Sequence, residues 1–171
     1  MTISRYLIVE GEFDKLLLSK ILPEHVIDRA QFVVGNGFSS AISLAKSMIF
    51  QVEQNLYLFL DTDTDDENKI YDKKKDLMNI FINNNYRNKI NFIYIKPEIE
   101  ILIIENKEVL NEIFNYKYTD DNIINYKRPR NILKEINNDY QKIISNKLTN
   151  DIIENIRKTN AYKEILKQIK I

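Results

Sequence analysis

Carboxylate side chains gather after three apolar segments of this chain, at spacings that would suit a metal site. They are Glu10 and Asp14, then Asp61 and Asp63, and finally Glu98 and Glu100. So many like charges in one place would repel one another and raise each other's pKa. A divalent cation such as Mg²⁺ prefers oxygen ligands and relieves this repulsion. Ions held in this way activate water and stabilise the charge that develops as a phosphodiester bond is cut.

The alternative is that these acidic residues simply form polar turns and helix caps. We prefer that interpretation for residues 65–67, which stand where a helix begins and favour its dipole. Asp61 and Asp63 alternate at a strand end, where alternate residues point to the same side, so both could contact one ion. For these two and for Glu10 and Asp14 we prefer a functional role, because both pairs fall at the same edge of the predicted sheet.

Short apolar runs and amphipathic segments alternate through the first hundred residues. The predicted strands are 6–9, 31–34, 56–60 and 90–95, and the helices between them are 13–22, 39–49 and 68–83. Buried strands that alternate with helices predict an α/β fold with a parallel sheet and helices on both of its faces. Ligands of such sheets bind beyond the carboxyl ends of the strands, which is where the acidic residues stand.

The chain changes character after Pro97. One helix is predicted over 98–114, a polar and basic loop over 115–130, and two amphipathic helices over 131–147 and 150–170. Residues 1–114 carry 13 basic and 18 acidic residues, whereas residues 115–171 carry 12 basic and 7 acidic ones. We therefore divide the chain into a catalytic domain (1–105) and a basic helical C-terminal extension (106–171). This charge difference is what a metal site beside a phosphate-attracting surface would produce. Chance, together with solvated helix faces, explains it equally well.

Composition excludes several kinds of chemistry. The 171 residues contain no cysteine, which rules out disulfides, thiolate zinc sites and cysteine nucleophiles. The only histidine, His25, follows a helix-ending proline and is expected at the surface, so metal-dependent chemistry is favoured over a histidine base. No apolar run is long enough to cross a bilayer and no signal peptide is recognisable, so we expect a cytoplasmic protein that does not contact membranes.

Two sequence motifs resemble those of the TOPRIM domain family. Residues 7–14 (LIVEGEFD) resemble its first motif, a strand followed by Glu-Gly-x-x-Asp. Residues 58–63 (LFLDTD) resemble its second motif, a strand followed by Asp-x-Asp, and residues 34–37 (VGNG) fall where the family carries a glycine turn. The resemblance covers roughly residues 3–100. It implies a TOPRIM-like, Rossmann-like sheet.

The same resemblance assigns roles to the carboxylates. It implies that Glu10 is a general acid/base or metal ligand, that Asp14 assists it, and that Asp61 and Asp63 bind Mg²⁺ or Mn²⁺. Relatives of the overcoming-lysogenization-defect (OLD) type use two ions and further acidic residues. Residues 96–100 (KPEIE) resemble their Pro-x-x-Glu segment, in which we prefer Glu100 to Glu98 as the additional metal ligand.

Basic residues close to these motifs are candidates for phosphate contacts. Lys96 could stabilise the transition-state phosphate as a catalytic residue. Lys127, Arg128 and Arg130 could grip a nucleic-acid backbone by charge, beside Tyr126 for stacking. In both cases a solvated basic side chain is an equally good interpretation.

The leading hypothesis is a small stand-alone TOPRIM nuclease of the OLD type, which cleaves DNA with two Mg²⁺ or Mn²⁺ ions. Defence against foreign DNA is an expectation from such relatives. The chain has no Gly-x-x-x-x-Gly-Lys-Ser/Thr loop, so an ATPase would be a separate partner. One alternative is an RNA-processing endonuclease of the 5S ribosomal RNA maturase type. Another is a non-catalytic subunit that binds nucleic acid or protein, and assembly into a homo-oligomer is left open.

Overall fold

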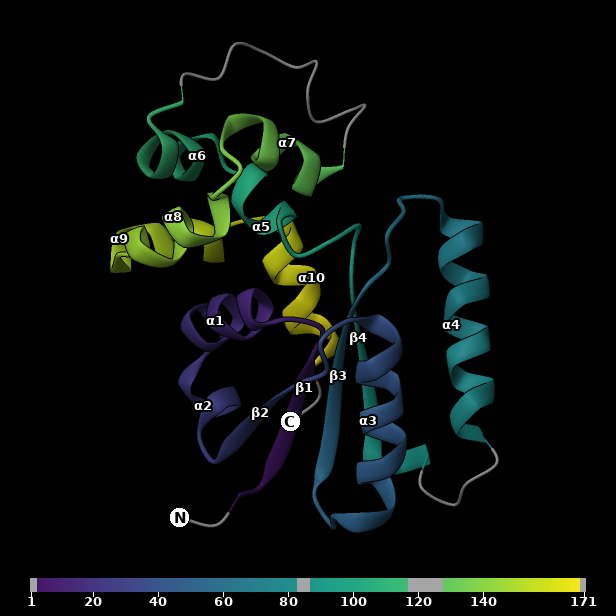
Figure 1. Cartoon of the computed structure of the whole chain (residues 1–171). Coiled ribbons are helices and arrows are strands. Elements are labelled where there is room, and N and C mark those ends of the chain that lie inside the picture. Colours follow the sequence, from purple (N-terminus) through teal and green to yellow (C-terminus); the bar gives the residue numbers. More distant parts are fainter. Residues whose placement is uncertain (1–2, 83–86, 117–127, 170–171) are drawn as a thin grey trace.

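Four parallel strands form the centre of the molecule, with helices on both faces of the sheet (Figure 1). The computed structural model describes residues 3–82, 87–116 and 128–169. The strands are β1 Arg5–Val9, β2 Ala30–Val34, β3 Asn55–Asp61 and β4 Ile90–Ile95, in the order β2-β1-β3-β4. The predicted α/β class and parallel sheet are therefore confirmed, and the architecture is consistent with a Rossmann-like fold.

Two helices cover one face of the sheet: α3 Phe38–Gln51 and α4 Glu67–Ile82 (Figure 1). The apolar face of α3 carries Ala45, and that of α4 carries Phe81. Both residues belong to a cluster of buried side chains that includes Ile8 of β1 and Leu58 of β3. Alternate strand residues point to opposite faces, so the next residues along these strands serve the other face.

The other face of the sheet is covered by α1 Glu12–Ile21 and by the C-terminal helices, while the short helix α2 Glu24–Ile27 lies beside β2 (Figure 1). One continuous hydrophobic core contains Leu7 and Phe59 of the sheet together with Ile144 and Ile156 of the C-terminal helices. The residues assigned to the C-terminal extension thus share a core with the sheet. A single 3₁₀ turn, η1 Arg87–Lys89, precedes β4.

The prediction of three long helices after Pro97 is wrong about their length, because the chain forms two shorter helices in place of each one. The six helices are α5 Ile101–Ile104, α6 Lys107–Phe114, α7 Pro129–Ile136, α8 Tyr140–Lys147, α9 Asn150–Arg157 and α10 Asn160–Gln168. The Asn106 side chain accepts hydrogen bonds from two backbone N–H groups of α6, and the Thr159 side chain accepts one from the N–H of Tyr162 in α10. These caps start a new helix within a continuous apolar pattern. Among the described residues, no helix is both long enough and apolar enough to cross a bilayer.

Candidate metal centre

Glu10 lies at the carboxyl edge of the sheet, held between two neighbouring strands. Its Oε1 accepts a hydrogen bond of 2.9 Å from the backbone N–H of Asp61, which is the last residue of β3. Its backbone carbonyl accepts a hydrogen bond of 2.7 Å from the N–H of Gly37, in the turn after β2. This turn requires Gly35, since a Cβ there would lie 2.5 Å from the Cα of Ala41 at the start of α3.

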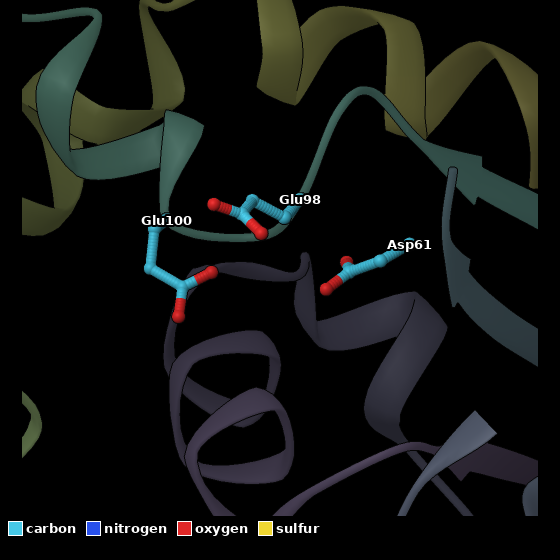
Figure 2. A group of neighbouring side chains, drawn as sticks. All are labelled: Asp61, Glu98 and Glu100. Atoms are coloured by element: carbon cyan, nitrogen blue, oxygen red, sulfur yellow. The ribbon is translucent and has the colours of Figure 1, made fainter. Parts of the chain in front are cut away.

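Three buried carboxyl groups converge beside this edge: those of Asp61, Glu98 and Glu100 (Figure 2). Ligand oxygens of the three lie within 4.8 Å of one another, which is close enough to hold one metal ion. The backbone N–H of Ile99 donates to Asp61 Oδ1 at 3.0 Å and so fixes the segment after β4 against the end of β3. The structure brings both Glu98 and Glu100 together with Asp61, so the sequence-based preference for Glu100 over Glu98 stays a prediction.

Two arginines at the start of α7 reach into this group of carboxylates. Arg130 donates through Nε to Glu100 Oε1 at 2.8 Å and through Nη2 to Asp61 Oδ2 at 3.2 Å. Its backbone N–H donates to Glu98 Oε1 at 2.6 Å. Arg128 Nη2 bridges Glu98 Oε2 at 2.8 Å and Asp63 Oδ1 at 2.5 Å. Both guanidinium groups, predicted to bind nucleic acid, therefore pair with the predicted metal ligands.

Asp63 stands at the outer side of the group and does not join the buried trio. Its backbone is left-handed, with φ of 62°, and its side chain is 51% exposed. Lys73 of α4 donates to Asp63 Oδ2 at 3.0 Å and to the carbonyl of Asp61 at 2.7 Å. The expectation that Asp61 and Asp63 face one ion together depended on extended backbone, which the left-handed residue interrupts. Sequence reasoning missed Lys73, which is one of several lysines on a polar helix.

The remaining predicted site residues have other contacts. Asp14 Oδ2 accepts a hydrogen bond of 2.8 Å from the N–H of Gly11 and so stabilises the first turn of α1. The ammonium of Lys96 pairs with Glu67 at the start of α4, and no contact joins it to the carboxylate trio in the described part of the chain. Lys127 lies outside the described residues.

Tyr140 is a further member of the site that sequence reasoning missed. Its hydroxyl donates to Glu100 Oε1 at 2.6 Å, and the side chain is buried. Its ring meets that of Phe13 edge to face, with centroids 5.9 Å apart. It is one of ten tyrosines, and no local pattern distinguishes it from the others.

The electrostatics of the site leave its carboxylates short of positive charge. Five carboxylates (Glu10, Asp14, Asp61, Asp63 and Glu100) act on one another through their charges, and Glu98 lies beside Asp61 and Glu100. The cations among the six are Lys73, Arg128 and Arg130. Burial raises the pKa of Asp61 to about 9, and the charges of Glu10, Asp14 and Glu100 add to that rise. Burial also raises the pKa of Asp14 to about 6.

The pKa of Asp63 is shifted in the opposite direction, because its side chain is more exposed and is paired directly with cations. Burial would raise its pKa, but hydrogen bonds from Lys73 and Arg128 outweigh burial and lower it. The group as a whole is therefore a buried, incompletely neutralised inner trio with an ionised outer carboxylate. Such an arrangement can hold a divalent cation, and it can bind protons where no cation is supplied.

Comparison with known proteins adds no assignment. The chain matches no protein-family model, and a search of curated protein sequences gives no match.

Proposed function

We propose that this protein is a divalent-metal-dependent TOPRIM nuclease that cuts phosphodiester bonds at the carboxyl edge of its sheet. One observation carries the proposal: a buried trio of carboxylates has more negative charge around it than its arginines and lysine neutralise. The two motifs that resemble TOPRIM sequences contribute Glu10, Asp61 and Asp63 to the same edge.

The donor atoms fit Mg²⁺ or Mn²⁺. All candidate ligands are carboxylate oxygens, which these hard cations prefer, and neither thiol nor imidazole groups belong to the cluster. Asp61, Glu98 and Glu100 would hold one ion. Glu10 and Asp63, whose charges act on each other, would supply oxygens for a second.

Bound ions of this kind would activate a water molecule and stabilise the charge on the reacting phosphate. The protein's own cations would assist in two ways. Lys73 holds the end of β3 through the carbonyl of Asp61 and the carboxylate of Asp63. The guanidinium groups of Arg128 and Arg130, which share their carboxylate partners with the metal ions, would be available to phosphate oxygens once those carboxylates bind metal.

The substrate and partners follow from the resemblance to OLD-type nucleases. That resemblance favours DNA over RNA and a separate ATPase as partner, with a role in defence against foreign DNA. An endoribonuclease would have the same carboxylate chemistry, so the experiment below compares both substrates.

A non-catalytic binding subunit is the second candidate, and the arginine contacts favour it. Each carboxylate of the buried trio has a guanidinium partner within 4.0 Å. These guanidinium partners offset part of the cost of burying the carboxylates without a metal, as a binding subunit would require.

The test is metal binding followed by cleavage. Calorimetry with Mn²⁺ would compare the wild type with Asp61→Asn, which keeps the shape of the buried group, and with Asp65→Asn, an exposed control close by. Supercoiled plasmid, single-stranded DNA and structured RNA would then be incubated with Mg²⁺, Mn²⁺ or EDTA. Binding and cutting that are lost in Asp61→Asn but retained in Asp65→Asn support the nuclease. Metal-independent nucleic-acid binding without cutting supports the second candidate.

A further inference from the structure

A cavity of about 500 Å³ lies against the turn between α7 and α8. Three cations line it, Arg130, Lys134 and Lys142, together with the amide side chains of Asn138 and Gln141. One carboxylate, that of Asp139, is also present, so the lining keeps a net positive charge. Its volume falls within the range of about 300–1,000 Å³ that is usual for small-ligand sites. The lining is that of an anion site with several hydrogen-bond donors.

The cavity shares part of its wall with the carboxylate trio. Arg130 lines the cavity, and its guanidinium contacts Glu100 and Asp61. Tyr140 lines it too, and its hydroxyl donates to Glu100 at 2.6 Å. An anion in the cavity would therefore lie directly beside the proposed cleavage site.

The three cations of the cavity differ in their ion pairing. Arg130 is paired with the carboxylate trio, whereas Lys134 and Lys142 form no ion pair with another residue of the described chain. The tyrosine ring is packed edge to face on Phe13 and is buried, so it presents no open face on which a base could stack. The recognition available here is of phosphate charge and not of bases.

We infer that this cavity binds a backbone phosphate of the nucleic-acid strand, next to the phosphodiester on which the carboxylate site acts. The inference rests on the proposed function, because it names a substrate contact of that site. Lys134 and Lys142 supply the charge, and the amide of Asn138 supplies further donors to phosphate oxygens. The Gln141 amide donates through Nε2 to the Tyr140 hydroxyl at 3.2 Å and keeps its second N–H for a phosphate oxygen.

The test measures binding without metal. A short fluorescently labelled single-stranded oligonucleotide is titrated in EDTA with the wild type and with a Lys134→Gln, Lys142→Gln double variant. The control is Lys46→Gln, Lys163→Gln, which removes two exposed lysines from α3 and α10, outside the cavity. We expect the cavity variant to bind about tenfold more weakly, and its plot of log affinity against log salt to be shallower by about 0.7, the slope for one phosphate contact on a single strand. The control should keep both the affinity and the slope.

Equal affinities and slopes for the cavity variant and the control would overturn the inference. Inorganic phosphate is titrated separately as a competitor. If inorganic phosphate binds as tightly as the oligonucleotide and displaces it, the inference is also overturned. The cavity would then recognise free phosphate and not a nucleic-acid strand.

Cleavage of the same oligonucleotide by the wild type with Mn²⁺ is measured in parallel and separates the two proposals. If the wild type cuts while the cavity variant binds normally, the nuclease stands and the cavity assignment fails. If the wild type does not cut but the cavity variant loses affinity, the cavity binds nucleic acid and the nuclease proposal fails.

Discussion

Arg130 has more contacts with the buried carboxylates than any other described side chain, and its removal tests the electrostatics of the whole site. The guanidinium pairs with Glu100 and Asp61, and it lies 3.9 Å from Glu98. The carboxylate side chains are 8% exposed or less, whereas that of Arg130 is 38% exposed. In Arg130→Ala these carboxylates would remain buried and would lose their main counter-charge.

The expected cost can be estimated from these contacts. Removing one partner of a buried ion pair costs about 3–5 kcal/mol. Arg130 is partly exposed and Arg128 still pairs with Glu98, so the lower end applies, about 3 kcal/mol. For a chain of this size that loss lowers the melting temperature by about 6–12 °C. The site should take up protons to compensate, so the loss should be smaller at acidic pH.

The assay is thermal unfolding followed by circular dichroism, in EDTA and then with Mn²⁺. We expect Mn²⁺ to raise the melting temperature of Arg130→Ala more than that of the wild type, because the ion replaces the missing charge. Lys167→Ala is the control, since it removes an exposed pair with Glu164 that is worth at most about 0.5 kcal/mol.

Two results would refute this reasoning. A melting temperature within about 2 °C of the wild type in EDTA would mean that the carboxylates do not depend on Arg130 for their counter-charge. If Mn²⁺ raises the melting temperature of the variant and the wild type equally, the ion and the guanidinium do not bind the same carboxylate oxygens.

Three further predictions concern the neighbouring residues. Tyr140→Phe removes the hydroxyl that donates to Glu100 and should lower the free energy of unfolding by about 1.5–3 kcal/mol in urea titrations. Burial raises the pKa of Asp14 from its usual 3.8 to about 6, so the native state keeps a proton that the unfolded chain has released. The wild type should therefore lose stability relative to Asp14→Asn as the pH rises from about 4 to about 6. Gly35→Ala places a Cβ 2.5 Å from the backbone of α3 and should lower the free energy of unfolding by about 1–3 kcal/mol. Gly11→Ala should leave it unchanged, because a Cβ there would meet nothing closer than 3.6 Å.

Each of these predictions has an outcome that would contradict it. An unfolding free energy unchanged in Tyr140→Phe would show that Glu100 does not depend on the hydroxyl. A stability difference between the wild type and Asp14→Asn that is constant across the pH range would show that Asp14 ionises with its ordinary pKa. Equal stabilities of the two glycine variants would mean that the turn after β2 can move away from α3 without cost.

The strands and the acidic edge of this fold could be predicted from the sequence. Strand 90–95 was predicted with its observed bounds, and the other three within one residue at each end. The central strands β1 and β3 are buried apolar runs, and the edge strands β2 and β4 are apolar apart from Gln31 and Asn91. The carboxyl ends of parallel strands share one edge, so the proximity of Glu10 and Asp61 also followed from local pattern and topology. The divisions within the last helices did not follow, because the apolar period continues across Asn106 and Thr159 while their side chains cap new helices.

Only the tertiary structure decided what surrounds the carboxylates. Arg130 reaches Asp61 across 69 positions in sequence, and Tyr140 reaches Glu100 across 40. The basic residues near 130 were recognisable as such, but their sequence does not show whether they face solvent or the acidic edge. That choice is made by burial, since Ile132 and Leu133 of α7 join the hydrophobic core shared by the sheet and the C-terminal helices. Sequence thus determined that carboxylates gather at the sheet edge, and the tertiary structure determined which of them meet and which cations they meet there.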